Sequence, residues 1–125
     1  MGIALGKIID IVGGFAPLDL QTARSGDYVS LRGCNHVTVV VYKGAGTDGD
    51  DPTFTFTQAK EVAGTNTTTL AIIDEYWEKE AATDLTGTGT WTRVTQTAAA
   101  TVAPGDPSAQ DVALYVFEID VDELD

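Results

Sequence analysis

The residues best suited to nucleophilic chemistry are a single cysteine and a single histidine, Cys34 and His36. A histidine beside a cysteine can accept the thiol proton and so activate the sulfur. Alternation along an extended chain places both side chains on the same side. Such a pair also needs a third group that orients the histidine, and the sequence identifies none. We therefore interpret His36 as a structural residue at the start of a strand, and we expect no catalytic residues and no zinc site.

A glycine motif follows the segment that contains His36. Gly44, Gly46 and Gly49 form a G-x-G-x-x-G pattern, which binds a dinucleotide when a helix N-terminus comes next. Here the segment 48–52 contains three aspartates and a proline, and this negative charge would repel a pyrophosphate. We interpret residues 44–52 as a hairpin loop and expect no cofactor.

Acidic clusters in that loop and at residues 120–125 offer the hard oxygen ligands that Ca²⁺ prefers. A calcium-binding EF-hand loop that opened at Asp48 would need glycine at its sixth position and glutamate at its twelfth. The chain has Thr53 and Ala59 there. We interpret both clusters as solvated charge and expect no metal site.

A third group of candidates combines carboxylates with aromatic residues. Glu75, Glu78 and Glu80 surround Tyr76 and Trp77, a composition found in glycosidase sites and in sugar-stacking platforms. Aromatic residues in a β domain more often lie in the core or at an interface. We therefore assign Tyr76 and Trp77 to an interface.

The elements that must position these residues have the alternating pattern of β-strands. HVTVVVYK (36–43) is rich in β-branched residues, and TFTFT (53–57) places Phe54 and Phe56 on one face. Residues 65–73 and 86–97 also favour strands, the latter with Val94 and Gln96 opposed to Trp91 and Arg93. Residues 112–124 predict a strand in the middle of a sheet, with Ala113, Tyr115, Phe117 and Ile119 opposed to Val112, Leu114, Val116 and Glu118.

Two segments complete the predicted elements. Residues 74–85 combine good helix formers with aromatic residues, so they fit either a helix or a continuing strand. Residues 98–111 have the composition of a loop. Several short strands, 13 glycines and many threonines predict an all-β fold, an antiparallel sandwich or jelly roll forming a single domain over residues 1–125.

The N-terminal segment MGIALGKIIDIV (1–12) fits neither a helix nor a strand, and Gly13-Gly14 ends it. We interpret residues 1–15 as an extended arm. It either packs on a neighbouring molecule or forms a plain edge strand. The residues expected at an interface are Ile3, Leu5, Ile8, Ile9, Tyr76 and Trp77.

Charge and cysteine content exclude several classes. A net charge of −12 disfavours direct binding to nucleic acids and to anionic membranes. One cysteine allows no intrachain disulfide. No apolar run reaches the roughly 18 residues of a membrane span, and Asp10 within the N-terminal apolar stretch suits no signal peptide. We expect synthesis in the cytoplasm.

Two blocks, CNHVTVVVYKGAGTDGDDPTFTFTQAKEVAG (34–64) and DVALYVFEIDVDELD (111–125), resemble small proteins encoded beside the major capsid protein in tailed bacteriophages. These are capsid cement or decoration proteins. The resemblance implies a sandwich or jelly-roll subunit, a dimer or trimer on the capsid exterior, that binds the major capsid protein and ties neighbouring shell subunits together. It implies no catalytic residues.

Two other functions fit the same composition. One is a different virion subunit, from the head-completion region or the tail, that assembles as a ring. The other is a carbohydrate-binding β-sandwich module with Trp77 or Trp91 as an exposed stacking platform.

Overall fold

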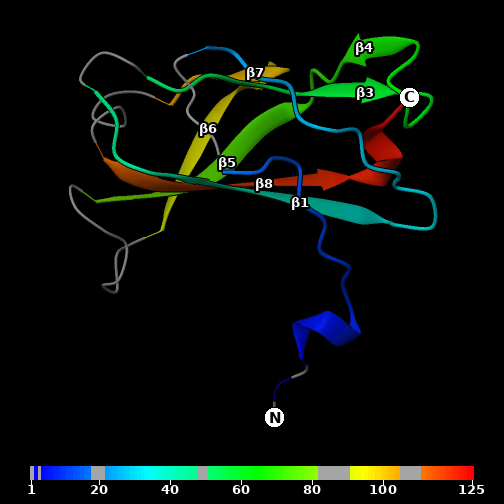
Figure 1. Ribbon diagram of the computed structural model, residues 1–125, viewed down its shortest axis with the longest axis horizontal. Helices are drawn as coiled ribbons and strands as arrows, with labels where there is room; N and C mark the ends of the chain where they lie inside the picture. Colours follow the sequence, from blue (N-terminus) through cyan, green and yellow to red (C-terminus); the bar gives the residue numbers. More distant parts are fainter. Residues whose placement is uncertain (1, 3, 18–21, 48–50, 82–90, 105–110) are drawn as a thin grey trace.

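The computed structural model describes residues 2, 4–17, 22–47, 51–81, 91–104 and 111–125. It is an antiparallel all-β sandwich, as the sequence predicts. One layer is a four-stranded sheet in the order β1-β8-β5-β6, and two small sheets, β2-β7 and β3-β4, lie over it (Figure 1). The strands are β1 (His36–Lys43), β2 (Phe54–Thr55), β3 (Thr57–Ala59), β4 (Thr67–Thr69), β5 (Ile73–Ala81), β6 (Thr92–Ala99), β7 (Thr101–Val102) and β8 (Val112–Asp120).

Strand β8 lies between β1 and β5, which confirms the predicted central position. Its alternation is also confirmed, because Ala113, Tyr115 and Phe117 are fully buried while Glu118 and Asp120 are exposed. The same alternation holds in β1 and, for Val94 and Gln96, in β6. A strand paired on both sides buries one complete row of side chains, so β8 supplies the centre of the core.

Residues 74–85, which by sequence fit either a helix or a strand, form part of strand β5 as far as Ala81. Residues 82–85 lie outside the described residues. Pairing with both β6 and β8 overrides the helix propensity of its glutamates and lysine. The register shifts between Ile73 and Glu75, which is the irregularity of a β-bulge. Ile73 and Tyr76 are therefore both buried although they are three residues apart, and this spacing hides the strand period in the sequence.

Several predicted boundaries are wrong. Within residues 65–73 only β4 and Ile73 have strand structure, and the strand predicted over residues 112–124 ends at Asp120. Residues 53–57 do not form one strand, because the chain changes partners at Phe56: its N–H donates to the carbonyl of Ala100, and its carbonyl accepts from Leu70. The predicted loop 98–111 begins with strand structure, since β6 continues to Ala99 and β7 follows. Val102 of β7 is fully buried, so the need to fill the core organises this segment despite its composition.

Aromatic side chains connect the two layers of the sandwich. The ring of Phe117 lies 5.8 Å from that of Phe54, 4.8 Å from that of Phe56 and 5.6 Å from that of Tyr76, measured between centroids. Phe54 comes from β2, Phe56 lies between β2 and β3, and Phe117 and Tyr76 come from the large sheet. Tilted and edge-on contacts of this kind add to the stability gained from burial.

The N-terminal segment forms an arm outside the sandwich. Residues 4–17 are all exposed and contain one short 3₁₀ helix, η1 (Leu5–Lys7). Figure 1 shows η1 outside the two layers, beyond the edge strand β1. A second 3₁₀ helix, η2 (Val121–Glu123), follows β8. Neither of these described helices has the length and hydrophobicity to cross a membrane.

Candidate functional site

A groove of about 1020 Å³ runs along the edge of β1. Within the described part of the chain, β8 pairs with β1 on one side and no strand pairs with it on the other. The groove is lined by Val37 from the inner face of β1 and by Thr38 and Val40 from the outer face. Since side chains of both faces border it, the groove follows the free edge, where backbone N–H and C=O groups are open to a partner.

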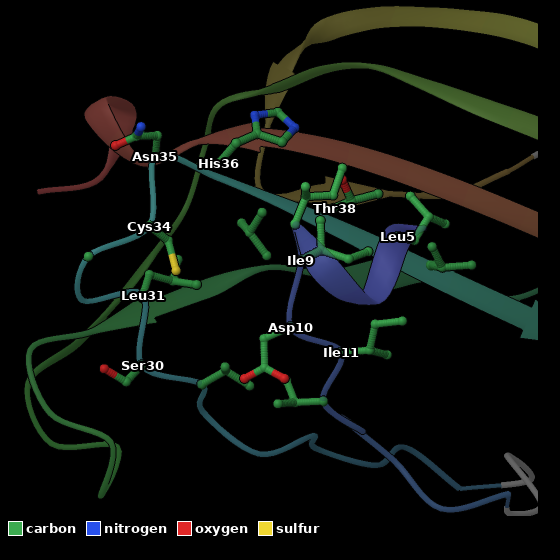
Figure 2. Close-up of a pocket in the computed structure, with 16 residues that line it drawn as sticks. Leu5, Ile9, Asp10, Ile11, Ser30, Leu31, Cys34, Asn35, His36 and Thr38 are labelled. Carbon is green, nitrogen blue, oxygen red and sulfur yellow. The ribbon is translucent and has the colours of Figure 1, made fainter. Parts of the chain in front are cut away.

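The opposite wall of the groove is the N-terminal arm. Five apolar arm residues line it with 47 to 77% of their surface exposed, namely Leu5, Ile8, Ile9, Ile11 and Val12. Figure 2 shows Leu5 and Ile9 of the arm beside Thr38 of β1. Val29 and Leu31, from the segment before β1, extend the apolar lining. The arm and the strand edge together form a surface that offers both apolar contacts and backbone hydrogen bonds.

His36 lies at the start of β1 and is held by two carboxylates from β8. Its Nδ1 lies 2.7 Å from Oδ1 of Asp120, and its Nε2 bonds to Oε2 of Glu118, which also accepts the hydroxyl proton of Thr38 at 2.7 Å. The register that pairs His36 with Asp120 brings these groups together across 84 positions of sequence. The hydrogen bonds to Glu118 and Asp120 raise the pKa of the imidazole above 6.5.

This arrangement corrects one expectation, because groups that orient the histidine do exist. It still excludes a Cys34–His36 nucleophilic pair, since both ring nitrogens bond to carboxylates and neither is left to accept the thiol proton. Cys34 is exposed, and Figure 2 shows its sulfur directed away from the imidazole. His36 lies at the start of strand β1, as predicted.

The predicted interface residues fall into three groups. Leu5, Ile8 and Ile9 are exposed on the arm, whereas Ile3 lies outside the described residues. The assignment of Tyr76 to an interface is wrong: it is 5% exposed and packs against Phe117 in the core. Its neighbour Trp77 is 38% exposed on the outer face of the large sheet, because adjacent residues of a strand point to opposite faces.

The three glutamates of β5 do not converge. Glu75 lies on the outer face and accepts hydrogen bonds from Arg93 of β6, with Nε of Arg93 at 2.7 Å. Glu78 and Glu80 alternate with Trp77 and so lie on the other face. The hydroxyl of Tyr115 donates to Glu80 at 3.1 Å. The sheet therefore separates Glu75 from Glu78 and Glu80, and the three glutamates do not form one cluster.

Burial changes the acidity of the two inner carboxyls. It raises the pKa of Glu78, and the neighbouring charge of Glu80 raises it further. Burial also raises the pKa of Glu80, although the hydrogen bond from Tyr115 opposes this. These groups lie at the end of the sandwich and are separate from the groove.

The acidic clusters give no metal site in the part of the chain that is described. Asp48, Gly49 and Asp50 lie outside it, so the calcium and glycine motifs there cannot be placed. Near the C-terminus, Asp120 is bonded to His36 and Asp125 is bonded to Gln58. No group of three or more acidic, histidine or cysteine side chains within the described ranges could hold a metal ion.

Comparison of the chain with protein families, curated proteins and solved structures finds no match. The site is therefore interpreted from its geometry. Sequence reasoning identified the arm but missed the groove, because the groove exists only once β1 has paired with β8 and left its other edge open. It also missed Glu118 and Asp120 as partners of His36. The sequence signal for these partners was the row of polar residues on one face of residues 112–124. That row does not specify which strand pairs with it.

Proposed function

We propose that this chain is a structural protein of a phage particle that binds the outer surface of the capsid and stabilises contacts between shell subunits. The single observation that carries the proposal is the apolar arm, which lies in water beside the free edge of β1. Each large apolar side chain moved from water into an interface contributes about 1.5 to 3 kcal/mol. An arm of this kind gains stability only when a partner covers it.

Support for a capsid as the partner comes from the two blocks, 34–64 and 111–125, that resemble cement proteins. They contain β1, β8 and the strand exchange at Phe56, which are the elements that build the groove and the core behind it. On a shell with many equivalent positions, a modest contact at each position is multiplied over the lattice. In this proposal the chain is a dimer or trimer on the shell and acts by covering protein surface.

The test uses capsids that lack this protein. Adding the purified chain raises their rupture temperature, measured by calorimetry or light scattering. A variant with Ile8→Asp and Ile9→Asp keeps the fold, because both side chains are exposed, but loses the effect. Val62→Asp is the matched control: it makes the same kind of change at an apolar residue that is 60% exposed and does not line the groove. An unchanged rupture temperature at saturating wild-type protein contradicts the proposal.

Copy number separates the capsid from the neck or the tail. A shell protein is present in on the order of hundreds of copies per particle, whereas a ring subunit of the head-completion region is present in about a dozen. Quantitative mass spectrometry of purified particles measures this number. The ring alternative is correct if the lower number is found.

A further inference from the structure

The outer face of the large sheet carries an aromatic hollow on the side away from the core. In the four-stranded register, Val40, Val116, Trp77 and Arg93 lie in one row across β1, β8, β5 and β6. Trp91 directly precedes β6. Trp77, Trp91 and Val116 line a shallow hollow of about 250 Å³. This volume is slightly below the usual range for drug-sized ligands, and it fits a single small ring.

Both indoles are accessible, with Trp77 38% and Trp91 45% exposed. A tryptophan buries more apolar area than any other side chain when it packs, so two exposed ones at a single hollow are costly unless a ligand covers them. Tyr76, on the other face of the same strand, is by contrast buried in the core.

A polar pair lies beside Trp77 on the same face of the sheet, just outside the residues that line the hollow. Arg93 lies opposite Trp77 in the register and donates to Glu75 through Nε and Nη2. Glu75 lies opposite Thr95. The guanidinium has five N–H donors, and the carboxylate and hydroxyl add acceptors. An apolar floor with hydrogen-bonding groups at one side matches a ligand that has C–H groups on its face and hydroxyls on its rim.

We propose that this hollow binds a neutral sugar ring of a glycan, with the ring stacked on the indoles and its hydroxyls bonded to Arg93 and Glu75. The net charge of −12 favours a neutral saccharide over a sulfated or carboxylated one. This goes beyond capsid stabilisation, because it gives the chain a second ligand of another chemical class. The hollow and the groove do not share a lining residue, so the two activities are separable.

The test measures binding of maltohexaose, cellohexaose and mannohexaose by calorimetry, with a polygalacturonate oligomer as the anionic comparison. At least one neutral oligomer binds, and the anionic one binds at least tenfold more weakly. Trp77→Ala and Trp91→Ala each weaken binding tenfold or more, because each removes one stacking surface. Trp77→Tyr keeps a flat ring and retains most of the affinity. Circular dichroism verifies that each variant is folded.

Tyr42→Ala is the matched control, since Tyr42 is an aromatic residue on the outer face, is 67% exposed and does not line the hollow. It leaves saccharide binding unchanged. The inference is overturned if no neutral oligomer binds, or if both tryptophan variants bind as tightly as the wild type. It is also overturned if no saccharide binds and Trp77→Ala instead weakens attachment to capsids, because the hollow is then part of a protein interface.

Discussion

At the scale of single residues, the most informative contact is the one between His36 and the two carboxylates of β8. An exposed ion pair ordinarily contributes little to stability, because water competes for the charges. Here one imidazole binds two carboxylates at once, Glu118 and Asp120, and so connects the starting end of β1 to the finishing end of β8. Both ring nitrogens donate at once only while the histidine is protonated, so the contact stabilises this register of the two strands most strongly in that state.

The first prediction concerns the pH dependence of stability. The folded state raises the pKa of His36 above 6.5, so the folded chain holds the proton more tightly than the unfolded chain does. The stabilisation is fully present below the unfolded value, and it is lost as the pH rises through the raised folded value. The variant His36→Gln lacks this pH-dependent part of the free energy of unfolding. Urea unfolding of the wild type and the variant across this pH range measures the difference.

The expected result is a free energy of unfolding that differs most between the two proteins at the acidic end. Thr38→Val serves as the control, because it removes a hydrogen bond to Glu118 but no titrating group. A difference between wild type and His36→Gln that stays constant with pH would mean that the imidazole is not held by the carboxylates.

At the scale of elements, strand β8 organises the fold. It pairs with β1 over eight residues and with β5 over five, and its inward row contains two of the largest fully buried side chains, Tyr115 and Phe117. Phe117 touches aromatic rings from both layers. A substitution in this row therefore affects both pairings and the packing of the layers together.

The second prediction is that Phe117→Ala lowers the free energy of unfolding by about 3 to 5 kcal/mol, the usual cost of removing a buried phenylalanine ring. This is a large part of the total for a domain of this size. Denaturant unfolding followed by fluorescence measures the change. Val40→Ala, on the paired strand but 59% exposed, shifts stability by no more than about 0.5 kcal/mol. Equal effects of the two substitutions would show that the layers are not packed as described.

At the scale of the whole molecule, the chain divides into a sandwich with a packed core and an arm that contributes nothing to that core. The buried residues of the core cluster all lie between Leu70 and Ile119 in the sequence, whereas no residue from 4 to 17 is buried. The arm is joined to the rest by a few contacts, such as the hydrogen bond from the amide of Asp27 to the carbonyl of Gly14. Its stability is therefore local and independent of the global unfolding.

The third prediction concerns hydrogen exchange. In the free chain the amides of β8 exchange most slowly among the described residues, because neighbours pair with the strand on both sides, and the amides of the exposed residues 10–16 exchange much faster. On capsids the arm becomes protected and β8 does not change. Exchange followed by mass spectrometry of peptides measures both. Slow exchange of the arm in the isolated chain would show that the arm already has a partner within its own molecule.

The sequence alone determined the class of the fold, because alternation is a local property. Residues 36–43 and 112–120 alternate in character, and this suffices to predict strands and to divide the central strand into two opposed rows of side chains. The arm was likewise identified as a separate segment, since its apolar residues follow no single period and two glycines end it, although the sequence left open whether it would form an edge strand. These features depend on neighbours within a few positions.

Only the tertiary structure decided which strands pair, and every feature of the site depends on that. The bulge in β5 places Tyr76 in the core and Trp77 on the surface, an outcome that adjacent aromatic residues in a sequence cannot specify. The β1–β8 register brings His36 to Glu118 and Asp120, and the sheet order leaves β1 at an edge beside the arm. Pairing is decided by which faces bury the most apolar area together, and that is a property of the whole chain.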